Sequence, residues 1–425
     1  MNIDQRILNH CTLLDEDGNL HTNQTIVIEN GIIKSISEEF LEGEDCTGLI
    51  ISPGLVNLHT HAAMNIFKGI AEDVHIDAWF NEEIWPYESK MEENDVRVGT
   101  KLAIAEMLNN GVTAFADHYF NPQSIIEAVE ETKIKADIAI TLFSQFPGYE
   151  EKLKEAIKLI QENKSNTVNL RLGPHSPYTC SFEALSEMSD WAKELKCGLH
   201  LHVSETQRQV EDSLDLHQKS PLQIVYEAGC LNVKCIIGHG LYINKDEFHL
   251  LSDDTSIALS VKTYEKLAMG VGYLWDNLDD KHYAIGTDGA ASSNTLSPIE
   301  QARMLALLHK HDKQDSTLSD LKSVWNLLMN GHKALSFNSG KLKAGYSADL
   351  VFWDLNRINT LPLYNPLASI IYSSDASNVK AVMINGNYVK EDYHLKLNEE
   401  ELIKEVQDTV SHLLERGKGK AKIEF

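Results

Sequence analysis

The chain is poor in paired cysteines, basic residues and long apolar runs. None of its six cysteines forms a CxxC pair, so we expect reduced thiols in a cytoplasmic protein. Lys and Arg total 38 against 63 Asp and Glu, and this net charge of −25 argues against a nucleic-acid partner, because such binding needs clustered cations. No run approaches the ~20 apolar residues of a membrane helix, and the first residues lack the pattern of a secretory signal. We therefore expect no membrane partner.

The chain does have enough apolar residues for a large core, since 43% of its 425 residues are hydrophobic. From Pro53 onward, short apolar runs alternate with longer amphipathic segments. Such strand-and-helix units predict an α/β fold, a (β/α)₈ barrel of the TIM type, which usually takes ~250 residues. A doubly wound open sheet is the alternative, but no glycine-rich phosphate loop follows any run. The predicted strands are 55–58, 112–118, 136–143, 168–175, 197–205, 233–240, 256–261 and 283–288.

Both ends of the chain favour β-structure. The segments QTIVIENGIIKSI and VKAVMINGNYV each contain an Asn-Gly pair, which is typical of a tight hairpin turn. We predict that residues 1–52 and 341–395 form one small composite β domain beside a barrel of residues 53–340. Residues 396–425 are expected to form a C-terminal helix and tail, with the helix from about 398 to 416.

Polar side chains end four of the predicted strands, at the end of a barrel where active sites form. Because side chains alternate along a strand, His59 and His61 face the same side, ~6.6 Å apart along the chain. His200 and His202 also share a side; His202 is the better candidate because it lies nearer the strand end, while His200 fits a packing position lower in the barrel. The candidate set is His59, His61, His202, Glu205, His239 and Asp288.

Imidazole nitrogens and a carboxylate in one place suit a divalent metal ion, with Zn²⁺ expected first and Fe²⁺ as the alternative. Four protein ligands and a water would give a five-coordinate centre, in which the metal lowers the pKa of the water toward ~7. Glu205 follows three residues after His202, just past the strand, where it can turn back toward this water and move its proton.

Several motifs together resemble the amidohydrolase superfamily: PGLVNLHTH, GPHSPYTC, LHVSET, GHG, GTDGAASSN and KLKAGYSADLVFWD. They are most similar to its 5′-methylthioadenosine/S-adenosylhomocysteine deaminases and to the chlorohydrolase-like (Atz/Trz) enzymes, over nearly the whole chain. The resemblance implies that Glu205 shuttles protons and that His239 orients or polarises the attacking water, with Asp288 completing the catalytic set. It also implies the metal ligands His59, His61, His202 and Asp288.

The resemblance further implies one metal ion rather than two. Binuclear members carry a carboxylated lysine at a strand end, usually the fourth, whereas the fourth strand here, VNLRLGPH, contains no lysine. We therefore expect a deaminase of an aminated heterocycle. Metal hydroxide would attack the carbon that bears the amine, Glu205 would protonate the neighbouring ring nitrogen, and ammonia would leave.

The resemblance also suggests substrate residues. Trp79 and Glu88 match residues that meet the ribose, and His175 matches one that touches the purine ring. In the alternative interpretations, Glu88 is a solvated helix residue and His175 is a structural residue at a strand end. The segment ITLFSQFPGYEEK lacks the arginines that hold an acidic tail in relatives. This favours 5′-methylthioadenosine or another 5′-substituted adenosine as substrate and argues against S-adenosylhomocysteine.

The segment VKTYEK replaces the HNPxSN motif that relatives usually have after the seventh strand. Lys262 or Lys266 is a candidate for meeting an anionic or carbonyl group of the substrate, and Tyr264 for covering its ring. In the alternative interpretation, Thr263 caps the following helix and both lysines face water.

Other functions stay open at this point. The same metal site could serve another ring, as in a guanine, pterin, pyrimidine or s-triazine deaminase or chlorohydrolase, and a non-catalytic barrel is a further alternative. A small-molecule substrate is expected in either enzyme, and homo-oligomers occur among similar proteins.

Overall fold

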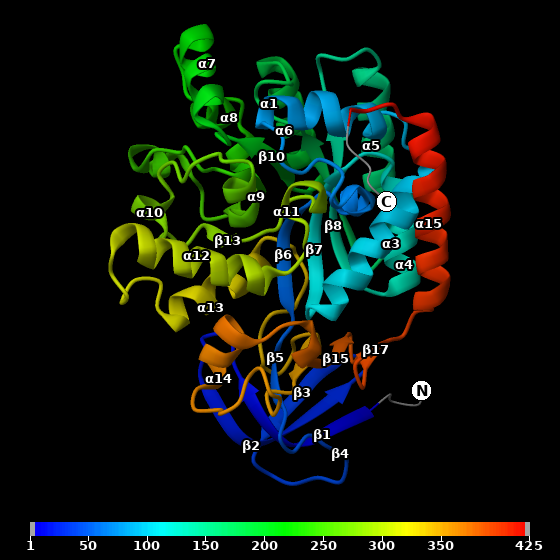
Figure 1. Cartoon of the computed structure of the whole chain (residues 1–425), viewed down its shortest axis with the longest axis vertical. Coiled ribbons are helices and arrows are strands. Elements are labelled where there is room, and N and C mark those ends of the chain that lie inside the picture. The colour runs from blue at the N-terminus through cyan, green and yellow to red at the C-terminus, as the bar shows by residue number, and fades with distance from the viewer. Residues whose placement is uncertain (1–4, 421–425) are drawn as a thin grey trace.

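Parallel strands alternate with helices through most of the chain and close into a barrel (Figure 1). The computed structural model describes residues 5–420. Its eight-stranded sheet follows chain order, so each strand pairs with the next. The backbone N–H groups of Thr287 and Asp288 donate to the carbonyl of His59, at 3.0 and 2.9 Å, and thereby join the last strand to the first. The strands are β6 (Leu55–Thr60), β7 (Val112–Tyr119), β8 (Lys135–Leu142), β9 (Val168–Pro174), β10 (Leu199–Val203), β11 (Cys235–His239), β12 (Thr255–Leu259) and β13 (Tyr283–Ile285). The predicted barrel is confirmed.

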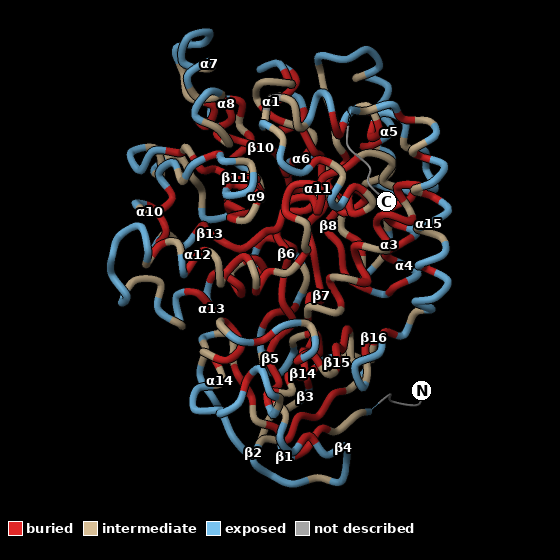
Figure 2. The backbone as a smooth tube through the Cα atoms, in the orientation of Figure 1, coloured by how far each residue is buried: buried red, intermediate tan, exposed pale blue. Residues whose placement is uncertain are grey.

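Helices surround these strands, and Figure 2 shows exposed segments on the outer side of the barrel and buried segments toward its strands. Ser181, Thr206, Ser220, Ser297 and Asp320 cap helices through side-chain hydrogen bonds, which explains where those helices begin. The longer helices are α3 (Glu93–Asn109), α4 (Pro122–Thr132), α5 (Tyr149–Glu162), α6 (Phe182–Leu195), α7 (Gln207–His217), α8 (Pro221–Glu227), α12 (Pro298–Lys313) and α13 (Leu321–Met329). The shorter ones include η1 (Ala62–Phe67), α1 (Ile76–Ala78), η2 (Trp79–Ile84), α2 (Trp85–Glu88), η3 (Cys230–Asn232), η4 (Lys245–Leu250), α9 (Val261–Lys266), α10 (Leu274–Asn277), α11 (Ala290–Ser293) and η5 (Asn330–Lys333).

The two ends of the chain meet in a second, mixed sheet, as predicted (Figure 1). Asn30-Gly31 and Asn385-Gly386 have positive φ at both positions (50° and 80°; 48° and 74°), the geometry of a tight hairpin turn. The strand order is β17-β16-β15-β14-β5-β1-β2-β3, and β4 pairs with β1. The strands are β1 (Gln5–Leu14), β2 (Leu20–Glu29), β3 (Ile32–Ser37), β4 (Glu44–Asp45), β5 (Ile50–Pro53), β14 (Leu350–Trp353), β15 (Val379–Ile384), β16 (Asn387–Glu391) and β17 (His394–Leu395). Between β14 and β15 lie α14 (Pro366–Ala368), η6 (Ser369–Ser373) and η7 (Ala376–Asn378).

The small sheet lies against the N-terminal ends of the barrel strands. The N–H of Gly54, just before β6, donates to the carbonyl of Asp349 at 2.9 Å. Lys135, the first residue of β8, donates to the Asp349 carboxylate at 2.6 Å, and both side chains are almost fully buried. The C-terminal ends of the barrel strands therefore lie away from the small sheet.

The charged C-terminal helix, α15 (Glu399–Arg416), packs along α3 (Figure 1). Lys101 on α3 pairs with Glu405 of α15 at 3.3 Å, and Leu402 and Leu413 of α15 are buried. Within residues 5–420, no helix has both the length and the apolar character that a membrane span requires.

Several predicted strands are too long at their C-terminal ends. Strand β10 stops at Val203 instead of continuing to 205, and β13 stops at Ile285 instead of 288. Ser204 and Asp288 have φ of 51° and 60°, and His239 at the end of β11 has φ of 70°. A left-handed residue turns the chain out of the extended conformation, which explains why β10 ends before Ser204 and β11 ends at His239.

Candidate active site

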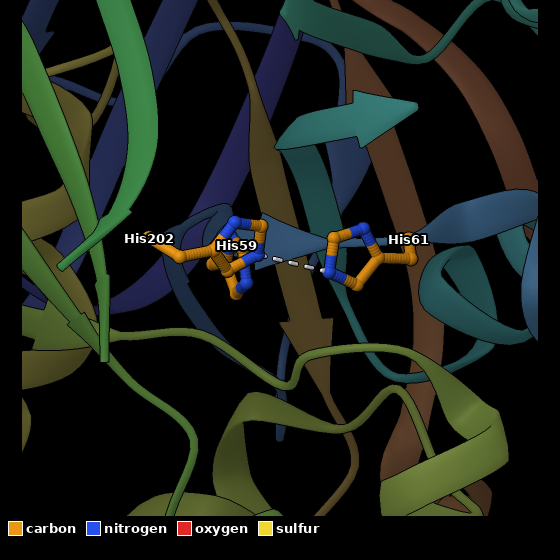
Figure 3. Close-up of side chains that lie close together, drawn as sticks. All are labelled: His59, His61 and His202. Carbon is orange, nitrogen blue, oxygen red and sulfur yellow. Dashed lines mark hydrogen bonds between the residues drawn. The ribbon is translucent and has the colours of Figure 1, made fainter. Parts of the chain in front are cut away.

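The four predicted metal ligands converge at the C-terminal ends of the barrel strands. His59 lies on β6, His61 follows that strand, His202 lies on β10 and Asp288 follows β13. Figure 3 shows the imidazoles of His59, His61 and His202 pointing toward one another. The Nε2 atoms of His61 and His202 are 3.3 Å apart, and Asp288 Oδ1 lies 3.2 Å from Nε2 of His61 and 3.7 Å from Nε2 of His59.

Backbone carbonyls fix two of these rings. Nδ1 of His61 donates to the carbonyl of His118 at 2.7 Å, and Nδ1 of His202 donates to the carbonyl of His175 at 2.9 Å. Because a carbonyl only accepts, each Nδ1 carries a proton, and Nε2 is the ring nitrogen that faces the centre. Gly238 on β11 makes room for this arrangement, since a Cβ there would lie 3.0 Å from His59 and 3.3 Å from His202.

The donor set fits a divalent cation. Nε2 of His59 is buried and has no hydrogen-bond partner among the described residues. Burial lowers the pKa of His59 and of His202 well below its ordinary value, which keeps both rings in the neutral form that binds metals. Burial also opposes the ionisation of Asp288, but hydrogen bonding and attraction from His61 outweigh it and lower the Asp288 pKa to about 2. Three imidazoles and one carboxylate are ligands that zinc and ferrous iron share.

Glu205 and His239 lie beside this centre. Nε2 of His239 is 3.5 Å from Oε1 of Glu205, and the His239 ring stacks on that of His202, with centroids 5.5 Å apart. The left-handed conformation of Ser204 turns the chain between His202 and Glu205, so the carboxylate returns toward the histidines. The structure thus brings together all six residues that sequence reasoning selected.

His175 borders the same cluster. Its ring centroid is 4.8 Å from that of His202, and it stacks on Phe143 at 4.7 Å. Its Nδ1 atom lies 3.0 Å from the hydroxyl of Thr179 and 3.1 Å from that of Ser176. Burial lowers the pKa of His175 to about 3, so the ring is neutral at physiological pH.

Glu88 is buried and accepts a hydrogen bond from the Tyr119 hydroxyl at 2.6 Å. The Tyr119 ring lies 6.3 Å from that of His61, which places Glu88 close to the centre. Glu88 is therefore not the solvated helix residue of the alternative interpretation. Burial raises its pKa, although the Tyr119 bond opposes the shift. Trp79 begins η2, is half-buried and packs against the main core.

Neither lysine of the VKTYEK segment is free. Nζ of Lys262 donates to Glu300 at 2.7 Å and to Thr295 at 3.1 Å. Nζ of Lys266 pairs with Glu72 at 2.7 Å. Both ammonium groups are committed to carboxylates, because α9 packs beside α12 and the loop that carries Glu72. The expectation that Lys262 is available to a substrate finds no support in these contacts.

The remaining expectations for this segment also need correction. Helix α9 begins at Val261 with Ser260 as its N-cap, so Thr263 is not the cap; its hydroxyl pairs with that of Ser292 at 2.9 Å. Tyr264 is buried, accepts a hydrogen bond from the N–H of Ser260 at 3.0 Å and packs 5.8 Å from the His239 ring. Tyr264 therefore packs against His239, and its burial gives no support to the expectation that it covers a substrate ring.

Two further histidines belong to the site. Nε2 of His200 lies 2.8 Å from Nδ1 of His59, so His200 orients a predicted metal ligand and is more than a packing residue. His118, near the end of β7, lies with its ring centroid 5.0 Å from that of His202, and its Nδ1 pairs with Thr141 at 3.0 Å. His118 is a polar residue near the end of the run FADHY, so the rule that active-site residues lie at strand ends would have identified it.

A closed barrel with histidines and a carboxylate gathered at the C-terminal ends of its strands is typical of a metal-dependent barrel enzyme. The model of the amidohydrolase family matches residues 50–389, and the chain belongs to that family. The predicted resemblance is thus confirmed.

Named relatives agree with this assignment. The chain is 34% identical over 413 residues to a 5-methylthioadenosine/S-adenosylhomocysteine deaminase of Dictyoglomus turgidum, covering 94% of this chain and 96% of the relative. It is 35% identical over 395 residues to a 5′-deoxyadenosine deaminase of Methanosphaera stadtmanae, covering 89% and 92%.

Solved structures share the fold. A zinc-bound adenosine deaminase of Xanthomonas campestris superposes with a TM-score of 0.90 and 26% identity, over 96% of this chain and 98% of the other. The zinc-complexed atrazine chlorohydrolase TrzN of Arthrobacter aurescens has a TM-score of 0.87 at 18% identity, over 95% and 99%, and shows the fold alone. The centre of this chain is a site for a divalent metal ion.

Proposed function

We propose that this protein is a metal-dependent aminohydrolase that deaminates a purine nucleoside with an uncharged 5′ substituent, such as 5′-methylthioadenosine. The observation that carries the proposal is the convergence of the imidazole Nε2 atoms and the Asp288 carboxylate, with Glu205 and His239 3.5 Å apart beside them. The names of the curated relatives support the purine nucleoside class.

His59, His61, His202 and Asp288 would hold the ion, and the bound ion supplies the Lewis acidity that makes a water nucleophilic near neutral pH. His239 orients the attacking water, because its Nε2 faces Glu205 and its ring is fixed against His202. Glu205 takes one proton from that water and gives it to the ring nitrogen beside the carbon under attack.

The second proton of the water then passes to the leaving amine. The carbon–nitrogen bond breaks, ammonia departs and the new carbon–oxygen bond becomes a ring carbonyl, while the ring nitrogen keeps the proton from Glu205. Water and the aminated ring are thus converted to the oxo ring and ammonia, with no other reactant.

The substrate residues of the proposal border this centre. Glu88 would accept hydrogen bonds from the ribose hydroxyls, since a carboxylate has several acceptor sites and Tyr119 occupies only one of them. Trp79 would cover the same end of the ligand, and His175 would contact the ring. A charged amino-acid tail on the 5′ position is disfavoured, because the segment after β8 offers no arginine.

Zinc is the ion that we propose, with ferrous iron as the alternative that uses the same ligands. The zinc-bound adenosine deaminase of similar fold supports this choice. Elemental analysis of the purified protein would decide between the two ions. About one zinc per chain is expected, and two metals per chain would contradict a single site.

Domain limits and location are also proposals. Limits of 1–52 with 341–395, 53–340 and 396–425 are supported by the change of sheet between Pro53 and Leu55. All six cysteines lie in the described part of the chain and are unpaired, which supports a cytoplasmic location.

A substrate panel tests the proposal. Ammonia release would be measured with 5′-methylthioadenosine, 5′-deoxyadenosine, adenosine, S-adenosylhomocysteine, guanine and cytosine, using metal-replete protein. The 5′-substituted neutral adenosines should react fastest and S-adenosylhomocysteine more slowly. Absence of turnover with every adenosine compound would overturn the proposal, and turnover of guanine or cytosine alone would assign another ring.

A further inference from the structure

The two carboxylate oxygens of Glu205 have different surroundings. Oε2 accepts hydrogen bonds from the Tyr178 hydroxyl and from Nε2 of Gln209, each at 3.4 Å. Oε1 lies on the other side, 3.5 Å from Nε2 of His239. One oxygen is therefore held by two donors of the protein, and the other faces the residue that borders the metal centre.

The start of helix α7 fixes the side chain of Gln209. Its side-chain Oε1 accepts from the backbone N–H groups of Glu205 and Thr206, both at 3.1 Å. The backbone N–H of Gln209 donates to the Thr206 hydroxyl at 3.3 Å. The amide oxygen must face these two N–H donors, so the amide nitrogen must face Glu205. This reciprocal capping box leaves Gln209 no freedom to exchange the two ends of its amide.

We propose that Gln209, together with Tyr178, is a positioning residue that makes Oε1 the oxygen of Glu205 that carries the proton. An amide nitrogen can donate but cannot accept. A proton on Oε2 would therefore point at another donor, whereas a proton on Oε1 leaves both bonds to Oε2 intact. The proton is in this way kept on the oxygen beside His239. The inference rests on the proposed function, because it assumes that Glu205 moves protons.

A purely structural role is the competing explanation, since Gln209 also caps α7. Gln209→Glu separates the two roles. The new carboxylate keeps both acceptor bonds to the backbone N–H groups, and Glu is as suitable as Gln at this position of a capping box. The variant loses the donor to Glu205 and in addition sets a second carboxylate beside Oε2.

The experiment measures kcat and KM for the best adenosine substrate in Gln209→Glu, Gln209→Met and Tyr178→Phe, with metal content and melting temperature for each. Gln207→Met is the matched control, because Gln207 lies on the same helix, is exposed and bonds only to Glu211 at 2.7 Å among the described contacts. We expect kcat to fall roughly tenfold or more in Gln209→Glu and Gln209→Met, with KM, zinc content and Gln207→Met little changed.

A double-mutant cycle tests whether Gln209 acts through Glu205. In a Glu205→Gln background, Gln209→Met should cause no further loss of kcat, since the carboxylate that it positions is absent. Equal losses in both backgrounds would overturn the inference, as would a kcat within twofold of wild type in Gln209→Glu. If Gln209→Met does not fold, Gln209→Glu still decides the question. Failure of the proposed function differs from either result, because the wild-type protein would then release no ammonia.

Discussion

The buried ion pair between Lys135 and Asp349 should be essential to the joint between the barrel and the small sheet. Their Nζ and Oδ2 atoms are 2.6 Å apart, and the side chains are 3% and 0% exposed. At an effective dielectric constant of ~20, two unit charges at this distance attract by roughly 6 kcal/mol. Desolvation offsets part of this attraction, so Lys135→Met, which leaves the Asp349 charge buried and unpaired, should lower the free energy of unfolding by about 3–5 kcal/mol.

Urea unfolding, followed by circular dichroism, measures this loss. Lys135→Met combined with Asp349→Asn should recover most of the lost stability. The neutral amide can still accept from the N–H of Asn385, which in the wild type donates to the Asp349 carboxylate at 2.8 Å. Lys158→Met is the control: Lys158 and Glu162 are exposed and 4.0 Å apart, so the change should stay below about 0.5 kcal/mol. A loss under about 1 kcal/mol in Lys135→Met would refute the reasoning, because a charge this deeply buried cannot lose its partner without cost.

Four other predictions follow from the site and its surroundings. Glu205→Gln should lower kcat by about 10²–10⁴ with metal content unchanged, and retention of a tenth of the activity would contradict its role as proton carrier. His200→Ala should weaken metal affinity by about 10–100-fold in a chelator competition, because it leaves Nδ1 of His59 without its partner. Lys262→Met should leave KM unchanged and cost at most about 1 kcal/mol of stability, since its ammonium is paired with a carboxylate; a changed KM would restore the substrate role. Burial lowers the pKa of Lys390 to about 8, below its ~10.4 in the unfolded chain. Between pH ~8 and ~10.4 the unfolded state therefore binds more protons than the folded state. The free energy of unfolding of the wild type, relative to Lys390→Met, should rise with pH over this range.

The convergence of the candidate metal ligands could be predicted because these residues obey two simple rules. Side chains alternate along a strand, and barrel sites form where strands end. His59, His61 and His202 follow both rules, and Asp288 and Glu205 lie within a few residues of a strand end. Each of these residues is informative in its own short segment, so no knowledge of distant contacts was needed to find it.

The partners of the VKTYEK lysines could not be predicted in this way. Lys262 meets Glu300, 38 residues later, and Lys266 meets Glu72, 194 residues earlier. Such pairs depend on how α9 packs against its neighbours, and local sequence carries no record of that packing. The same holds for the contact between His200 and His59, which lie 141 residues apart.

The ends of the strands show a second limit, and it bears on function. Ser204, His239 and Asp288 are non-glycine residues with positive φ, a conformation that costs on the order of 1–3 kcal/mol when the residue is not glycine. They follow or end β10, β11 and β13, the strands that deliver Glu205, His239 and Asp288 to one centre. An extended chain at these positions would continue along the barrel axis and carry the three side chains away from His59, His61 and His202. The left-handed turns instead direct them inward, and backbone bonds hold the turns in place: the carbonyl of Ser204 accepts from the N–H of Tyr242 at 2.9 Å, and the N–H of Asp288 donates to His59 at 2.9 Å. The strain is therefore localised where the chemistry requires it, and the barrel around it supplies the stability that maintains it.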